Sequence, residues 1–169
     1  MATFTQESGD ENQLSGKWTV KLSKFDKSVL EAENYECDSG LNWHVHEKKV
    51  PEPGNCGATG GHADPTFGCT GASEFRKKAC DGDPIDGVGE PKTYPGNCCD
   101  LIGNDYACDG GENLIKCEAG DQSGKLGQIK FNKKTQVFQD SFILPIDDLE
   151  QLSLVVHCGS PRVACGNFD

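Results

Sequence analysis

The sequence predicts an all-β protein, and three observations support this prediction. Several segments alternate apolar and polar residues with the period of two that is typical of β-strands. Glycine is abundant, at 21 of 169 residues, which indicates many turns and loops. No segment carries a convincing helical pattern. The strand-like segments number about eight, as in a β-sandwich or a β-barrel.

The first strands are predicted near the N-terminus. Residues 2–6 alternate weakly. Residues 16–25 alternate clearly, with Trp18 and Val20 on one face and lysines on the other, which is typical of an antiparallel strand with one solvated face. Residues 30–35 are predicted to form a further short strand.

The next predicted strand carries two histidines. His44 and His46 are two residues apart, so their side chains project on one face, while Trp43 and Val45 project on the other. Such a pair alone is more often a partly exposed polar pair than a pair of metal ligands. The remaining histidines change this balance.

His62 follows two glycines on a tight loop, and His157 ends an apolar run that predicts a buried strand. These two complete the set of four histidines in the chain. An all-nitrogen site of this kind suits copper, zinc, iron or nickel. Tetragonal nitrogen ligation points toward Cu(II).

The segment between the second and third histidine motifs is of a different kind. Residues 66–117 show no clean periodicity and contain six of the ten cysteines. We expect a long insertion loop that disulfides hold in order. Within it, residues 81–86 weakly suggest calcium but lack the spacing and closing glutamate of an EF-hand.

The C-terminal part is predicted to be β again. Residues 128–131 and 135–138 are expected to form a hairpin, followed by a short apolar segment at 141–144. Residues 153–157 and 162–165 are the last two predicted strands.

The composition indicates the cellular location of the protein and excludes some classes of partner. A net charge of −11 argues against binding to nucleic acid or to an anionic membrane. Ten cysteines without a Cys-x-x-Cys pair favour disulfides, and therefore an extracellular location. No signal peptide or transmembrane run is visible, so the chain is expected to be a mature or excised domain.

The histidine motifs resemble those of the copper/zinc superoxide dismutases. The resemblance spans roughly residues 41–166 and implies an eight-stranded antiparallel Greek-key β-barrel. The whole chain, 1–169, would then be one domain with 66–117 as a cysteine-rich insertion. The matching motifs, in order, are His44-Val45-His46, Gly61-His62 with Pro65, Val156-His157, and Arg162-Val163-Ala164-Cys165-Gly166.

Two differences from the copper/zinc enzymes indicate which subfamily the chain resembles. Glu118 stands where the copper/zinc enzymes have a zinc-binding histidine, while Asp121 is retained. His157 and Arg162 are separated by four residues, where those enzymes insert a long charged loop. The chain is therefore most similar to the copper-only superoxide dismutases and related repeat proteins.

This resemblance implies one copper ion and no zinc. The four histidines would hold the copper, and Glu118 would orient the other nitrogen of His62, with Asp121 supporting its loop. His62 and Glu118 would relay a proton, and Arg162 would offer a fixed positive charge to superoxide. Lys48 and Lys125 are expected to add local positive potential.

The resemblance also implies one disulfide, Cys56–Cys165. The pairing of the other eight cysteines stays open. Cys158 is expected to point away from the copper because it directly follows His157.

The predicted function is that of an extracellular copper-only superoxide dismutase, either a monomeric domain or one repeat of a larger chain, with superoxide as its substrate. No nucleic acid and no membrane insertion are expected. The alternative is a copper-binding or structural repeat module with little or no activity. A third possibility is a disulfide-rich adhesion domain whose histidines are fortuitous.

Overall fold

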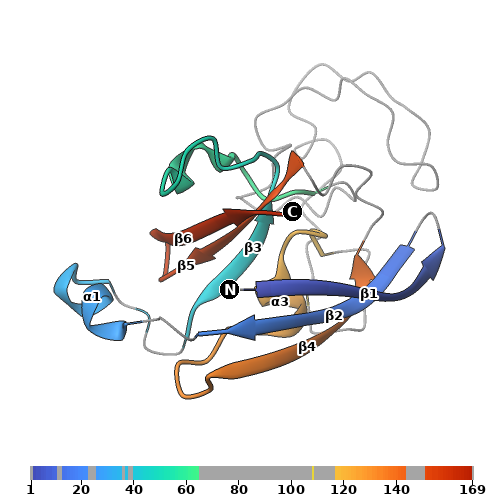
Figure 1. Cartoon of the computed structure of the whole chain (residues 1–169), viewed down its shortest axis with the longest axis horizontal. Helices are drawn as coiled ribbons and strands as arrows, with labels where there is room; N and C mark the ends of the chain where they lie inside the picture. Colours follow the sequence, from blue (N-terminus) through green and yellow to red (C-terminus); the bar gives the residue numbers. More distant parts are fainter. Residues whose placement is uncertain are drawn as a thin grey trace.

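The computed structural model describes residues 2–10, 13–22, 26–35, 37, 40–64, 108, 117–143 and 151–168. These residues form two three-stranded antiparallel sheets, shown in Figure 1. One sheet has the order β1-β2-β4 and the other the order β3-β5-β6. The strands are β1 (Ala2–Asp10), β2 (Gln13–Lys21), β3 (Asn42–His46), β4 (Thr135–Ile143), β5 (Ser153–His157) and β6 (Arg162–Asn167).

The prediction of a mostly β protein is confirmed. The described part of the chain contains six strands in two open sheets, and the closed eight-stranded barrel is not found in it. Three short helical elements accompany the sheets: α1 (Lys27–Ala32), the 3-10 helix η1 (Cys56–Thr59) and α3 (Gln122–Leu126).

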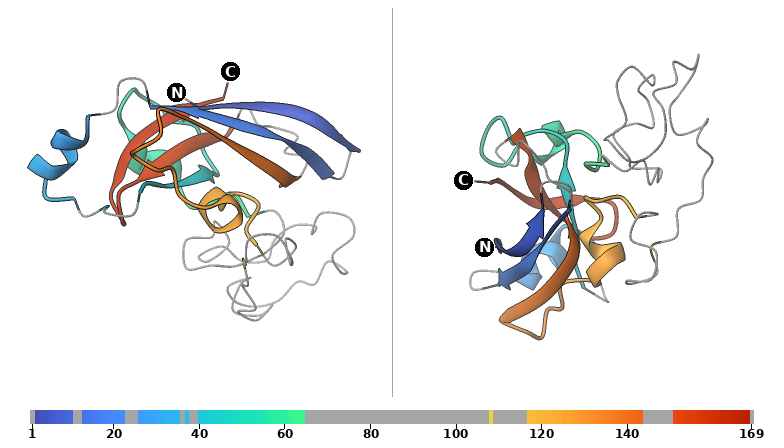
Figure 2. Two further views of the ribbon diagram at one scale, coloured as in Figure 1. Left: turned by 90° about the horizontal axis from the view of Figure 1, so that it is seen from below. Right: turned by 90° about the vertical axis from the view of Figure 1, so that its right-hand side faces the viewer.

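The predicted strand at residues 30–35 is wrong, because α1 occupies much of this range. The Asp26 side chain accepts hydrogen bonds from the backbone N–H of Ser28 at 3.0 Å and from its hydroxyl at 2.6 Å, which satisfies donors at the start of the helix. Leu30 is buried against the core. Figure 2 shows that α1 lies at one end of the two sheets.

The predicted hairpin at residues 128–138 is also wrong. Strand β4 pairs with β2 instead, and Ile129 pairs with Leu41 through two backbone hydrogen bonds of 2.9 Å. The turn before β4 is closed by the side-chain amide of Gln136, which bonds to both the N–H and the carbonyl of Lys130. A side chain replaces the backbone ladder that the hairpin would have needed.

The core lies between the two sheets and is aromatic. Trp18 of β2 and Trp43 of β3 meet edge to face with ring centroids 5.4 Å apart, and Phe138 of β4 lies 5.0 Å from Trp43. Both predicted apolar faces are confirmed: Trp18 and Val20 of β2 are buried, and so are Trp43 and Val45 of β3. Burial of these side chains joins the sheets.

Three disulfides lie among the described residues: Cys37–Cys158, Cys56–Cys165 and Cys108–Cys117. The first explains why Cys158 points away from the histidines. The possible calcium segment at 81–86 and most of the predicted insertion at 66–117 lie outside the described residues. Among the residues that are described, no helix is long and apolar enough to cross a membrane.

Candidate metal centre

Strands β3 and β5 bring three of the histidines onto one face of their sheet. The register pairs His46 with Ser153, His44 with Val155 and Asn42 with His157. Residues directly opposite in an antiparallel pair project on the same face. His44 and His46 therefore share a face with His157, while Trp43 and Val45 occupy the core face.

His62 reaches the same place through a tight loop after β3. The loop folds back along the strand, because Glu47 N–H donates to Gly61 O at 3.0 Å and Ala63 N–H donates to Val45 O at 2.9 Å. Gly60 has a φ of +76°, and a Cβ atom there would collide with the Glu47 carboxylate. Gly60, one of the two glycines before His62, therefore specifies the loop sterically.

The four imidazoles form one cluster. Each of His44, His46, His62 and His157 offers a ligand nitrogen, and these nitrogens all lie within 4.8 Å of one another. Nε2 of His46 lies 3.4 Å from Nε2 of His157. Metal–nitrogen bonds to zinc are about 2.0–2.1 Å long, so a single ion at the centre brings its ligand nitrogens to within about 4.2 Å of each other.

Three of the rings are oriented by acceptors behind them. Nδ1 of His46 donates to Gly60 O at 3.1 Å, and Nδ1 of His157 donates to Ser160 O at 3.3 Å. Nδ1 of His62 donates to the Glu118 carboxylate at 2.6 Å. Because the acceptors hold the proton on Nδ1, Nε2 of each ring is left with a lone pair for the centre.

His44 has the opposite orientation. Its Nδ1 is buried and has no hydrogen-bond partner among the described residues, while its Nε2 lies 3.5 Å from the Asp121 carboxylate. A buried polar nitrogen without a partner is costly unless something binds it. A metal ion at the centre would satisfy this atom, so the donor set fits a metal.

The imidazole rings are also in the neutral form that metal ligation requires. Burial, together with the neighbouring His62, lowers the pKa of His44 to about 2. Burial, followed by the same neighbour, lowers the pKa of His46 to about 3, and burial also lowers the pKa of His157. Metal ligation requires the neutral imidazole, and these rings are held in that form at neutral pH.

The segment Glu118–Lys125 supports the cluster from one side. Gly120 fits between β3 and the His62 loop: Val45 N–H donates to Gly120 O and Gly120 N–H donates to Ala63 O, each at 2.8 Å. A Cβ atom at Gly120 would lie 2.5 Å from Val45 O and 2.6 Å from Ala63 O. Only glycine allows this close approach, which places the fully buried Glu118 against His62.

The rest of this segment is anchored by side chains. Asp121 caps α3 by accepting from Gly124 N–H at 2.8 Å. The Ser123 hydroxyl accepts from Trp43 N–H at 2.6 Å and donates to Trp43 O at 3.2 Å, which joins α3 to the histidine strand.

Lys125 does not add positive potential to the surface, contrary to the sequence-based expectation. Its side chain is fully buried, and its ammonium nitrogen lies 3.0 Å from the Asp140 carboxylate. Trp18 Nε1 donates to the same carboxylate at 3.1 Å. The charge of Lys125 is neutralised in the core, whereas Lys48 is exposed.

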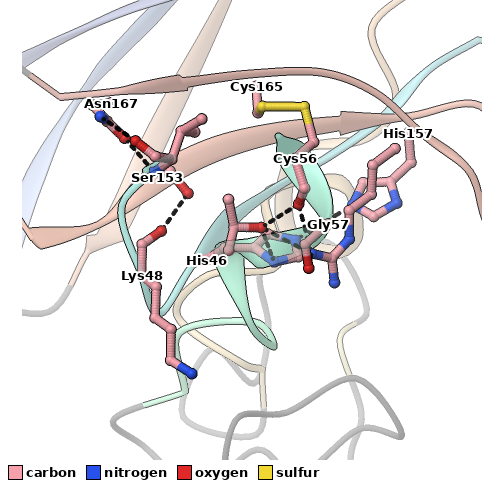
Figure 3. Close-up of a disulfide and its surroundings, with 11 residues drawn as sticks. His46, Lys48, Cys56, Gly57, Ser153, His157, Cys165 and Asn167 are labelled. Atoms are coloured by element: carbon pink, nitrogen blue, oxygen red, sulfur yellow. Dashed lines mark hydrogen bonds between the residues drawn. A yellow bond between two sulfur atoms is a disulfide. The ribbon is translucent and has the colours of Figure 1, made fainter. Parts of the chain in front are cut away.

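Arg162 lies beside the cluster at the start of β6, where it pairs with His157. Its Nη1 donates to Cys56 O and to the Thr59 hydroxyl, each at 2.8 Å, and its Nη2 donates to Gly60 O at 2.7 Å. The Cys56–Cys165 disulfide joins the same loop to β6, as the resemblance implies. Figure 3 shows this bond above His46 and His157.

Comparison with known proteins identifies the fold. A solved structure of a variant of superoxide dismutase 5 from Candida albicans matches with a TM-score of 0.50 at 20% identity, covering 97% of this chain and 76% of that chain. The chain has the superoxide dismutase fold. The Cu(II) structure of the same Candida protein matches with a TM-score of 0.47 at 19% identity, covering 97% and 78%. No family model and no curated protein matches the sequence.

Within this superoxide dismutase fold, the predicted residues that lie in or beside one cluster are the four histidines, Glu118, Asp121 and Arg162. Lys125 lies in the core instead, and Pro65 lies outside the described residues. Two contributors were missed. Ser123 belongs to the motif that carries Glu118, so its spacing was a usable signal. Thr59 lies in a Gly/Ala/Thr stretch with no pattern that distinguishes it.

Proposed function

We propose that this chain is a copper-only superoxide dismutase domain, which converts superoxide to oxygen and hydrogen peroxide. One observation carries the proposal: four imidazole nitrogens lie within 4.8 Å of one another, and the outer nitrogen of His62 donates to a buried carboxylate. All-nitrogen sites with tetragonal geometry favour Cu(II). The fold is also that of a superoxide dismutase.

The proposal includes one copper ion and no zinc. His44 would ligate through Nδ1, and His46, His62 and His157 through Nε2. Glu118 supports the exclusion of zinc. Its carboxylate accepts a hydrogen bond from the outer nitrogen of His62, which is the nitrogen that binds the second metal in the bimetallic enzymes. In the described residues, the four-histidine group is the only cluster of potential metal ligands.

A bound copper ion would supply one-electron chemistry, by taking an electron from one superoxide and giving it to a second. Arg162 would attract the anion. Its loop contacts use Nη1 and one N–H of Nη2, so other guanidinium N–H groups remain without a partner among the described residues. A fixed cation of this kind stabilises negative charge without having to reorganise.

His62 and Glu118 would handle a proton. The 2.6 Å hydrogen bond to the Glu118 carboxylate holds a proton on Nδ1 of His62, so that Nε2 faces the centre. When Nε2 is not ligating copper, it could carry one of the two protons that hydrogen peroxide requires, and the second would come from water. Asp121 would support the arrangement as the cap of α3 and neighbour of His44.

The proposed setting is extracellular. Three disulfides among the described residues support an oxidising compartment. The net charge of −11 supports the absence of nucleic acid and anionic membranes as partners. We propose a monomeric domain or one repeat of a larger chain, with residues 66–117 as its insertion.

The alternative is a copper-binding or structural module without useful turnover. It shares the four histidines with the leading proposal, so metal binding alone does not separate the two. The retention of Arg162 and Glu118 beside the cluster favours the enzyme, because a storage site needs neither an anion-attracting cation nor a proton carrier.

The test is superoxide dismutation by the copper-loaded protein, with metal content measured by mass spectrometry. We expect one copper per chain, no zinc, and fast turnover that is lost in His62→Ala. Glu118→Gln should weaken copper binding or lower activity roughly 10- to 100-fold, the usual effect of losing such a partner. The zinc-loaded protein is the inactive control.

Each alternative predicts a different result. Copper bound at one equivalent without turnover would support the binding module. Zinc retained at one equivalent beside copper would contradict the proposed role of Glu118.

A further inference from the structure

The Thr59 hydroxyl occupies a position between two functional groups. Thr59 is fully buried at the end of η1. Its Oγ1 lies 2.8 Å from Nη1 of Arg162 and 3.3 Å from Nδ1 of His46. It also donates to Cys56 O at 2.9 Å. One side chain therefore contacts the proposed anion-binding cation and a proposed copper ligand.

The single proton of the Thr59 hydroxyl determines which group donates in each of these hydrogen bonds. A hydroxyl has one proton and two acceptor lone pairs. Because Thr59 gives its proton to Cys56 O, its oxygen can only accept from Arg162 and His46. His46 must then carry its proton on Nδ1, which leaves Nε2 unprotonated and facing the centre.

Arg162 and His46 also share a second acceptor. Gly60 O accepts from Nη2 of Arg162 at 2.7 Å and from Nδ1 of His46 at 3.1 Å. The guanidinium and the imidazole are thus held side by side on the same two oxygens. Of these, Gly60 O is a backbone atom, whereas the Thr59 hydroxyl depends on one side chain. Figure 3 shows the peptide from Cys56 to Gly57 lying next to His46 and His157.

We propose that Thr59 is a positioning residue that couples Arg162 to His46. It fixes the direction of the guanidinium toward the metal centre and helps to keep His46 in the tautomer that can ligate. The inference rests on the proposed function, since it treats Arg162 as the anion-attracting group and His46 as a copper ligand. The probe is therefore azide, which reports anion binding without turnover.

The experiment compares azide affinity in copper-loaded wild type, Thr59→Val and Thr59→Ser, followed by optical titration. Valine keeps the shape and removes the hydroxyl, so we expect roughly tenfold weaker azide binding, the effect of one lost hydrogen bond to a charged group. Serine keeps the hydroxyl and should bind azide within about twofold of wild type. Equal affinity in wild type and Thr59→Val overturns the inference.

Two controls separate positioning from general loosening. Ser153→Ala removes another fully buried hydroxyl, which donates to Lys48 O at 2.7 Å and does not contact Arg162. It should leave azide affinity unchanged. In an Arg162→Gln background, Thr59→Val should have no further effect on azide binding, because coupled residues are not additive. A full second loss, or an equal loss in Ser153→Ala, overturns the inference.

A measurement on the metal-free wild type can overturn the inference even if Thr59→Val fails to fold. Long-range ¹H–¹⁵N NMR correlation reports which nitrogen of His46 carries the proton. We expect the proton on Nδ1, and a proton on Nε2 overturns the inference. Absent dismutation combined with weaker azide binding in Thr59→Val would reject the proposed function alone. Normal dismutation with unchanged azide binding would reject the inference alone.

Discussion

Removal of one charge from the buried pair of Lys125 and Asp140 should destabilise the protein strongly. Their side chains are 0% and 1% exposed, and the ammonium nitrogen lies 3.0 and 3.3 Å from the two carboxylate oxygens. Asp140→Asn keeps the shape of the side chain and an acceptor for Trp18, but leaves the lysine charge uncompensated. Breaking a buried pair in this way typically costs about 3–5 kcal/mol.

Loss of the lysine proton limits the penalty for the uncompensated charge. Burial lowers the pKa of Lys125, and Asp140 is the chief group that opposes this shift. In Asp140→Asn the lysine can escape the penalty by losing its proton. At pH 7, removing the proton from a lysine with an ordinary pKa of about 10.4 costs about 4.6 kcal/mol, because each pKa unit corresponds to about 1.36 kcal/mol. Deprotonation therefore limits the penalty for the uncompensated lysine charge to about 5 kcal/mol.

The second variant isolates the interaction. Lys125→Met in the Asp140→Asn background removes the uncompensated charge, so the double variant should be more stable than Asp140→Asn by about 2–3 kcal/mol. Stability of Asp140→Asn should also rise with pH toward 10.4, since the unfolded chain then binds more protons than the folded one.

The assay is urea unfolding at pH 7 with the disulfides intact, followed by tryptophan fluorescence. Stability is read from the midpoint at a constant slope. A cost below about 1 kcal/mol for Asp140→Asn would refute the reasoning, because surface pairs contribute no more than that. Additive effects of the two substitutions would also refute it.

Three further predictions concern the metal centre. Gly120→Ala should destabilise the protein by roughly 1–3 kcal/mol and lower its copper content, because the new Cβ would lie 2.5 and 2.6 Å from two backbone oxygens. The matched control is Gly166→Ala, whose Cβ would meet nothing within 4 Å. Thermal unfolding and metal analysis check this. The metal-free protein should lose stability as pH falls from about 6.5 toward 5, at up to about 1.4 kcal/mol per unit for each of His44 and His46. The reason is that their folded pKa values, about 2 and about 3, keep them neutral while the unfolded chain takes up protons. A flat urea midpoint over that range would contradict it. Cys165→Ser, which removes the bond to β6, should cost about 2–4 kcal/mol in urea unfolding, and no change would count against an anchoring role.

Much of the site could be predicted from the sequence because its signals are local. The His44-x-His46 spacing determines a shared face through the period of a strand, and the structure places both rings as this period requires. The two glycines before His62 indicate a steric loop, and Gly60 has the positive φ expected of one. The resemblance added Glu118 and the Cys56–Cys165 pair, neither of which follows from spacing alone.

Other features were decided only by the tertiary structure. The partner of β4 is β2, because the buried Trp18 and the partly buried Phe138 pack in the shared core, and no local pattern distinguishes that pairing from a hairpin. Lys125 is a buried cation only because Asp140 lies opposite it. Thr59 contacts Arg162 across 103 residues of sequence.

Local periodicity in this protein therefore determined which face each strand presents and which histidines share a face. It did not determine which strands pair, or which polar side chains are buried together. Those choices depend on contacts between distant segments, where burial of an apolar side chain or a charge is favourable only once its partner is in place.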